Sequence, residues 1–383
     1  MKVLNQIRII DTSPYLPSQY CSFQLEQLGA EVILTERPGE RAEPFPGLFE
    51  LLNCNKKSIQ LDLKSYTGRE MFHRLAGTSD VIIEGFRPGV MGRLGIGYED
   101  IKKIKPDIIY CSISGFGQDG PYKDKPGHDV TYLGLSGFFS ISGQIGTRPS
   151  RPGIPIVDLY TGMMATISIL ASIMMREKTG EGQYIDLSMF DVVSALTSMR
   201  AGALLVKNEP LKNEHILATN GVFMTKDGLM VTLGIVNEEH FWQNLCKTVG
   251  DEFELDNPLF ATYAGRVKNC EKLSDLLTNM FLQKTRAEWL LLFKNTDVPL
   301  SPVATIEEAL SDPQILHRGL INQTEDAQSN KINVFGFPVK FSSITTGIQS
   351  PPPKPGQHTR QILEELGYPD EIISTLEPRK AKQ

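Results

Sequence analysis

The first third of the chain alternates short apolar runs with amphipathic stretches, and this alternation restricts the fold more than any other feature. The apolar runs have the length of buried strands and lie at Ile7–Asp11, Glu31–Thr35, Asp80–Glu84 and Asp107–Ser112. Helical periodicity appears between them at Tyr20–Leu28, Thr67–Ala76 and Tyr98–Ile104. Strands that alternate with helices predict βαβ units and an α/β fold with a parallel sheet. Right-handed crossovers then place the loops that follow the strands along one edge of that sheet.

The size and composition of the chain narrow the class of protein. Its 383 residues suffice for a large and a smaller domain. The net charge of −6 lacks the basic excess of a nucleic-acid-binding protein. The start has no signal-peptide pattern, and the apolar stretch Met163–Met175 is too short to span a bilayer. We therefore expect a soluble, cytoplasmic protein with neither a nucleic-acid nor a membrane partner.

Cysteine and histidine spacing gives no indication of a metal site. The five cysteines include no CxxC pair, which is typical of reduced thiols. None of the six histidines stands four residues from another, so a zinc site is not expected.

A shift in composition after Arg200 predicts a second domain. We expect a linker at residues 201–220 and a small α/β domain at 221–320, with a short strand at Met230–Gly234 and helices after it. A further strand is expected at Phe337–Ser342.

A glycine motif after the strand that ends near Ser112 matches the glycine spacing of a dinucleotide-binding fingerprint but not its structural context. Gly115, Gly117 and Gly120 have the GxGxxG spacing. That fingerprint requires a helix to begin at its third glycine, so that the pyrophosphate meets the helix N-terminus. Here Pro121 and Pro126 follow, which predicts a loop. The motif therefore argues against nicotinamide or flavin binding.

Several cations lie in or beside the loops that follow the predicted strands: Arg37, Lys56, Lys57, Arg87 and Arg93. Guanidinium and ammonium groups that converge near glycines suit a phosphate-rich ligand. A solvated charged surface explains any one of them equally well, so the interpretation depends on their shared placement.

Three residues are candidates for chemistry. Asp158 lies between an apolar run and the apolar helix expected at Leu159–Lys178, where backbone N–H groups favour a carboxylate. A plain N-cap aspartate would occupy the same position. His128 beside a second aspartate, and Glu238 after the strand Met230–Gly234, are the other candidates, although a structural histidine and a solvated glutamate are the ordinary alternatives.

Taken together, the motifs resemble CoA-transferase family III, which also includes the α-methylacyl-CoA racemases. The resemblance runs along nearly the whole chain. Its pieces occur in order at Gln27–Ile33, Glu36–Gly39, Asn53–Ile59, Glu84–Gly89, Gly115–Pro121 and Arg176–Gln183.

The resemblance implies a large Rossmann-like domain that takes residues 1–200 and the returning segment 321–383, plus the small domain. It also implies two subunits interlocked as a homodimer. CoA or acyl-CoA would be bound as a substrate, with no permanently bound cofactor. By position, the contacts to CoA would come from Arg37, Asn53, Asn55, Lys56, Phe86, Arg87 and Arg93.

The two branches of the family use the aspartate at the position of Asp158 in different ways. In the transferases it attacks the thioester, an aspartyl anhydride and then an aspartyl-CoA thioester form, and CoA passes to an acceptor carboxylic acid. In the racemases the aspartate and a histidine form a two-base pair on opposite faces of the α-carbon.

The residues carry signals of both branches. His128 and Glu238 fall on the racemase positions, and Glu84–Arg87 is also racemase-like. Asp158–Met163 and Ser112–Gly117 resemble the transferases. We favour a CoA-transferase, with a racemase as the alternative and a supporting subunit of a hetero-oligomer as a more remote one.

Overall fold

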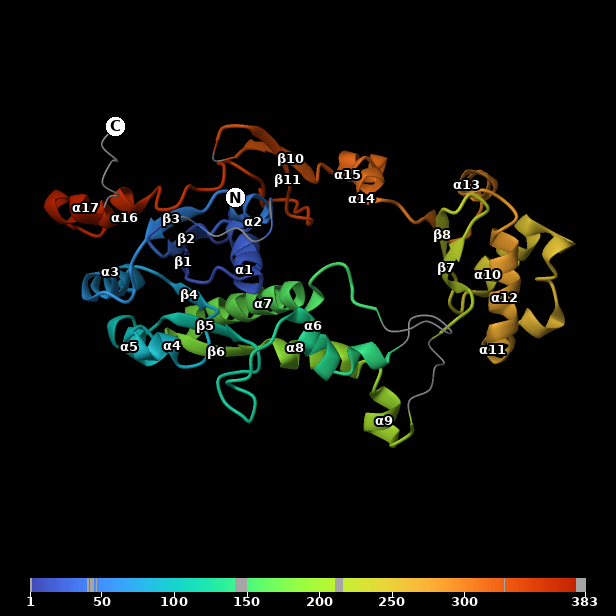
Figure 1. Cartoon of the computed structure of the whole chain (residues 1–383), viewed down its shortest axis with the longest axis horizontal. Coiled ribbons are helices and arrows are strands. Elements are labelled where there is room, and N and C mark those ends of the chain that lie inside the picture. The colour runs from blue at the N-terminus through green and yellow to red at the C-terminus, as the bar shows by residue number, and fades with distance from the viewer. Residues whose placement is uncertain are drawn as a thin grey trace. The chain divides into compact units, whose positions relative to one another are not determined.

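The computed structural model describes residues 2–39, 41, 45, 47–141, 150–210, 216–326 and 328–376. The chain divides into two compact units. The large unit comprises residues 1–138, 152–198 and 314–383, and the small unit comprises residues 139–151 and 199–313 (Figure 1). The chain therefore leaves the large unit in its middle and returns to it for the C-terminal segment.

A six-stranded sheet of entirely parallel pairs forms the centre of the large unit. Its strands are β1 (Arg8–Asp11), β2 (Glu31–Glu36), β3 (Lys57–Gln60), β4 (Val81–Glu84), β5 (Ile109–Ser114) and β6 (Gln183–Ser188). They lie in the order β3-β2-β1-β4-β5-β6, so the direction of strand addition reverses between β1 and β4. Ligands of doubly wound sheets bind outside the carboxyl ends of the strands at such a reversal. The predicted α/β fold with a parallel sheet is confirmed.

Helices cover both faces of this sheet. The helices of the large unit are α1 (Leu16–Gln27), α2 (Leu48–Asn53), α3 (Tyr66–Gly77), α4 (Val90–Arg93), α5 (Tyr98–Ile104), α6 (Asp129–Leu135), α7 (Ile156–Thr179), α8 (Met189–Ser198), α16 (Thr359–Glu365) and α17 (Asp370–Leu376). Helix α15 (Pro313–Arg318) begins at the border between the two units. A hairpin of β10 (Ile321–Glu325) and β11 (Lys331–Phe335) follows it in the returning segment.

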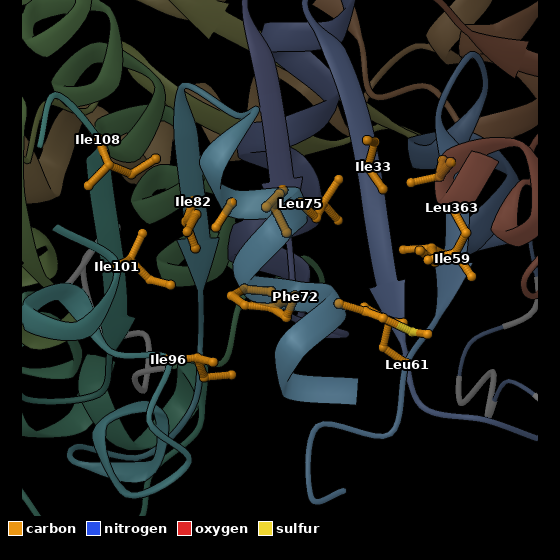
Figure 2. Close-up of a cluster of buried hydrophobic side chains, with 14 of the residues drawn as sticks. Ile33, Ile59, Leu61, Phe72, Leu75, Ile82, Ile96, Ile101, Ile108 and Leu363 are labelled. Atoms are coloured by element: carbon orange, nitrogen blue, oxygen red, sulfur yellow. The ribbon is translucent and has the colours of Figure 1, made fainter. Parts of the chain in front are cut away.

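Two apolar clusters hold the sheet between its helices. Ile9 and Ile10 are adjacent in β1 and belong to different clusters, because successive strand side chains point to opposite faces. The cluster that contains Ile10 includes Phe72 and Leu75 of α3 and Leu363 of α16 (Figure 2). Each fully buried aliphatic side chain of this kind contributes about 1.5–3 kcal/mol through removal from water. The returning segment is thus part of the core of the large unit.

Helix α7 contributes to the second cluster, with Ala165, Ile169 and Ile173. A Cβ at Gly162 would lie only 2.8 Å from the carbonyl oxygen of Pro17, so glycine permits the close approach of α7 to α1. By length and composition alone α7 could cross a membrane, so the expectation that its apolar stretch is too short is wrong. Its packing against α1 and the sheet is that of a core helix.

One predicted strand is absent, and one observed strand was not predicted. Residues 337–342 form no strand, and β11 ends earlier, at Phe335. Pro338 lacks the N–H that a ladder needs, and the rings of Phe337 and Phe341 stack on each other instead. Strand β3 was not predicted, because its sequence Lys-Ser-Ile-Gln carries a single large apolar residue.

The small unit has its own core. It contains an antiparallel sheet of β7 (Asn220–Met224), β8 (Met230–Gly234) and β9 (Leu300–Pro302). Its helices are α9 (Gly202–Lys207), α10 (Glu239–Val249), α11 (Tyr263–Lys268), α12 (Cys270–Phe281), α13 (Arg286–Phe293) and α14 (Ile306–Leu310). Trp289 is fully buried at the centre of this core.

Candidate active site

Asp158 lies in the first turn of α7, and it is not the cap of that helix. The N-cap position is Pro155. The backbone N–H of Val157 instead donates to Oδ2 of Asp129, at 2.8 Å. Asp129 therefore caps α7 from another helix. The plain N-cap explanation for Asp158 is excluded, and its carboxylate makes no hydrogen bond or ion pair with any described residue.

The surroundings of Asp158 raise the pKa of its carboxyl group to about 6. Burial is the largest cause, because removal from water disfavours the anion. The charge of Asp129 adds to the increase, and His128 opposes it. A carboxylate with such a pKa is ionised at neutral pH and is a stronger base and nucleophile than an ordinary aspartate.

His128 lies close enough to Asp158 for its charge to act on that carboxylate. It is the residue before α6, and its backbone N–H donates to Oγ1 of Thr131 at 2.9 Å. Its side chain is exposed. The structure therefore brings two of the three candidate residues, His128 and Asp158, into one region of the large unit.

The third candidate, Glu238, belongs to the small unit. It precedes α10, and its Oε2 accepts the backbone N–H of Val236 at 3.0 Å. Hydrogen bonds from its own turn lower the pKa of this half-buried carboxyl group. Locally it stabilises a turn, and its role in chemistry stays a prediction.

Two polar atoms near Asp158 lack partners among the described residues. Oδ1 of Asp129 and Oγ1 of Thr161 are buried without a hydrogen bond. Thr161 follows Asp158 by three residues and so lies on the same side of α7. Unpaired buried polar atoms are rare, and a group of them indicates a place where water or a ligand completes the structure.

The exposed cations lie beyond the carboxyl ends of the strands, as the loop pattern predicted. Arg37 follows β2, whereas Arg87 and Arg93 follow β4. All three side chains are exposed, and none forms an ion pair with another described residue. Phe86 beside them packs on the core, and its N–H donates to Oε2 of buried Glu84 at 2.8 Å.

Lys56 is placed differently from the other predicted contacts to CoA. Only 2% of it is exposed. Its Nζ donates to Oγ of Ser22 and Oδ1 of Asn53, both at 2.8 Å, and to the carbonyl oxygen of Gln19. All three donors of the ammonium group are thus used inside the protein. Burial lowers the pKa of Lys56 to about 8, and the charge of Asp11 opposes this.

The two asparagines near Lys56 also make internal bonds. Asn53 is fully buried, and its Nδ2 donates to the carbonyl oxygen of Phe49 at 3.0 Å. Asn55 has a φ of 65° and holds the returning segment, since its Oδ1 accepts N–H groups of Gln349 and Ser350. Contacts of Asn53, Asn55 and Lys56 to a ligand stay predictions, and a contact to the Lys56 ammonium group would have to replace an internal bond.

The glycine motif after β5 is a loop, as its prolines predicted, and α6 begins only at Asp129. The backbone N–H of Gln118 donates to Asp186 of β6 at 3.0 Å, which ties this loop to the sheet.

Comparisons with known proteins identify a matching family, similar proteins and a similar solved structure. Residues 4–359 match the family described as CoA-transferase family III. The chain is 36% identical over 391 residues to the succinyl-CoA:glutarate CoA-transferase of Mus musculus, covering 98% of this chain and 89% of the mouse protein. It is 32% identical over 388 residues to the alpha-methylacyl-CoA racemase of Mus musculus, covering 98% and 96%. A crystal structure of a CAIB/BAIF family protein from Brucella suis superposes with a TM-score of 0.82 at 29% identity, covering 95% of this chain and 99% of that one.

Proposed function

Because this chain belongs to CoA-transferase family III, we propose that it moves CoA from an acyl-CoA thioester to a carboxylic acid, with Asp158 as the nucleophile. CoA enters this reaction as part of the substrate. The ionised carboxylate of Asp158 attacks the thioester carbon, and the carbon–sulfur bond breaks to release CoA thiolate. The thiolate then attacks the aspartyl carbonyl of the resulting anhydride and releases the first acid. The acceptor carboxylate finally takes CoA by the same two steps in reverse order.

One observation carries this proposal: the Asp158 carboxylate is half-buried and makes no bond to a described residue, while Asp129 provides the helix cap. A structural aspartate at a helix start would bond the backbone itself. A nucleophile must instead keep its oxygen lone pairs available. With a pKa of about 6, Asp158 is mostly ionised at pH 7 and keeps more nucleophilic strength than an ordinary aspartate.

The placement of the cations supports CoA as the ligand. Arg37, Arg87 and Arg93 follow strands of one parallel sheet, so they lie beyond the same edge. Their guanidinium groups are exposed and free of ion pairs with described residues. Arginine binds phosphate oxygens through paired N–H groups, and CoA carries three phosphates.

We further infer that the substrates are short dicarboxylic acids and their CoA thioesters. The support is the relative that acts on succinyl-CoA and glutarate, at 36% identity over 98% of this chain.

The test is to incubate the purified protein with succinyl-CoA and glutarate and to follow glutaryl-CoA by mass spectrometry. Asp158→Asn is expected to lower kcat by at least about a thousandfold, because the amide cannot form the anhydride. CoA affinity by calorimetry should stay within about threefold, since the Asp129 cap is untouched. Asp119→Asn, in an exposed residue of the glycine loop, is the matched control. An Asp158→Asn variant with a tenth of wild-type turnover would contradict the proposal.

A racemase is the second candidate, and His128 is the observation that favours it. His128 lies close enough to Asp158 for its charge to act on that carboxylate, and a two-base mechanism requires two bases near one α-carbon. The branches differ in D₂O: a racemase exchanges the α-hydrogen of a branched acyl-CoA with no acceptor acid present. We expect slow exchange and a mild effect of His128→Ala on transfer. Fast acceptor-independent exchange that His128→Ala abolishes would make this protein a racemase.

We also propose that the chain forms a homodimer. Large apolar side chains lie exposed along one stripe of α7, at Met163, Ile167 and Met174, and Met175 is exposed beside it. A second copy of the chain would cover this stripe. Light scattering at micromolar concentration should give twice the mass of 42.6 kDa, and Ile167→Glu should shift the population toward monomer. A folded wild-type monomer would refute this proposal.

A further inference from the structure

Tyr132 is a nearly buried residue whose hydroxyl group has no assigned role. It lies in α6, one turn after Asp129, with 3% of its surface exposed. Its Oη makes no hydrogen bond to any described residue. By contrast, Oη of buried Tyr110 donates to the carbonyl oxygen of Ile96 at 3.0 Å. Since no described protein group pairs with it, the Tyr132 hydroxyl is available to donate to an external acceptor.

Two glycines hold the Tyr132 ring in place. A Cβ at Gly115 would lie 2.4 Å from Oη of Tyr132, and a Cβ at Gly127 would lie 2.7 Å from it. The ring also packs edge-on against Phe116, with centroids 5.3 Å apart. Gly115 is the first glycine of the GxGxxG motif. That glycine therefore accommodates a tyrosine hydroxyl, which explains its presence in a loop that opens no helix.

The hydroxyl group and the candidate nucleophile act on each other. Burial raises the pKa of the Tyr132 phenol, and the negative charge of Asp158 raises it further. The phenol is therefore protonated at neutral pH and can donate a hydrogen bond to an oxygen that carries negative charge. Helices α6 and α7 are joined directly by the bond from Val157 to Asp129. Yet no hydrogen bond links Tyr132 to Asp158, so the two groups are in electrostatic range with a gap between their oxygens.

We propose that the Tyr132 hydroxyl donates a hydrogen bond to the carbonyl oxygen of the acyl thioester while Asp158 attacks the carbonyl carbon. This inference rests on the proposed function. As Asp158 forms its bond to carbon, the carbonyl electron pair moves to oxygen, and Tyr132 stabilises that developing charge. The pair returns when the carbon–sulfur bond breaks and CoA thiolate leaves. Tyr132 keeps its proton throughout, so no acid or base is consumed.

The first test is Tyr132→Phe, which removes one oxygen and keeps the ring against Phe116. Removing one donor to a developing oxyanion lowers kcat by about 100- to 1,000-fold. We expect a fall in this range, with KM for the acyl-CoA within about threefold and Tm unchanged, since no protein bond is lost. Tyr122→Phe is the matched control, because Tyr122 also packs on Phe116, at 5.5 Å, but is exposed. It should keep wild-type kcat.

A second variant tests the position of the hydroxyl group. Gly115→Ala places a Cβ 2.4 Å from Oη of Tyr132, which must move, so kcat should fall at least about tenfold. In Tyr132→Phe the hydroxyl oxygen is absent, and the ring atom nearest to the new Cβ is Cζ, at 3.1 Å. A small shift of the ring then relieves the contact. In the Tyr132→Phe background the same substitution should therefore change kcat less than about twofold. Additive losses in this cycle would contradict the proposal.

The outcomes separate this inference from the proposed function. If the wild type transfers CoA and Tyr132→Phe keeps kcat within about threefold, Tyr132 is not the donor and the transferase proposal stands. If the wild type exchanges α-hydrogens instead, the transferase proposal fails. The same carbonyl oxygen then becomes an enolate, and Tyr132→Phe must slow exchange by the same factor. A loss of kcat that comes with a matching fall in Tm, or a wild type inactive in both assays, overturns the inference.

Discussion

The charge of Asp129 is expected to control the pH range in which Asp158 works. Asp129 caps α7 through Oδ2 and raises the pKa of its neighbour, so one carboxylate has two separable effects. Asp129→Asn keeps an oxygen that can accept the N–H of Val157 and removes the charge. Asp129→Ala removes both. The pair of variants therefore distinguishes electrostatics from capping.

The size of the effect follows from the pKa of Asp158. With a value of about 6, roughly one tenth of Asp158 is ionised at pH 5. Without the Asp129 charge this pKa falls toward the ordinary 3.8, and burial keeps it from falling the whole way. The activity of Asp129→Asn at pH 5, relative to its activity at pH 8, should exceed the wild-type ratio by up to about tenfold. The tenfold limit would apply if the pKa of Asp158 returned completely to 3.8. The rate at pH 8 should fall slightly, because a weaker base is a weaker nucleophile.

The assay is kcat/KM for CoA transfer from pH 4.5 to 8.5. In Asp129→Asn, the fall in kcat/KM on the acidic side of the profile (the acidic limb) should move to lower pH, and Tm should stay nearly unchanged. Asp129→Ala should move the limb equally and lower the free energy of unfolding by about 1 kcal/mol through loss of the cap. Asp119→Asn should leave the limb where it is. An unmoved limb in a folded Asp129→Asn variant would refute the electrostatic reasoning.

Three further outcomes are expected. Asp158→Asn should raise the free energy of unfolding at pH 7: since the folded pKa of Asp158 is raised, ionisation of its carboxyl group opposes folding progressively between the ordinary pKa of 3.8 and about pH 6 and fully above it, so urea titrations at pH 4 and 8 should show the larger gain at pH 8. Lys56→Met should lower the free energy of unfolding by about 3–5 kcal/mol, because buried Asp11 loses the positive charge that balances it. Urea unfolding measures the loss, with Lys123→Met at an exposed lysine as the control. A loss below about 1 kcal/mol would contradict the expected role of the Lys56 charge. Gly162→Ala should cost about 1–3 kcal/mol, since its Cβ would meet the Pro17 carbonyl at 2.8 Å; an unchanged Tm would show that α1 and α7 can separate freely.

The sequence by itself determined the class of fold and the loops that matter. Strands of four to six residues between amphipathic helices allow few arrangements, because βαβ crossovers are right-handed and parallel strands are buried on both faces. Pro121 and Pro126 were enough to show that the glycine motif opens no helix. The apolar helix after Asp158 identified that residue as a candidate. These conclusions depend on residues close in sequence, whose local preferences can be read directly.

Only the tertiary structure decided what each polar group does. Asp129 and Val157 are 28 residues apart, and the packing of α6 on α7 makes one the cap of the other. Lys56 has the sequence context of a ligand contact, yet the fold encloses it with Ser22 and Asn53. Gly115 serves a tyrosine 17 residues further along the chain. Hydrogen bonds, burial and pKa shifts depend on neighbours that long-range packing brings together, and local sequence patterns carry no record of those neighbours.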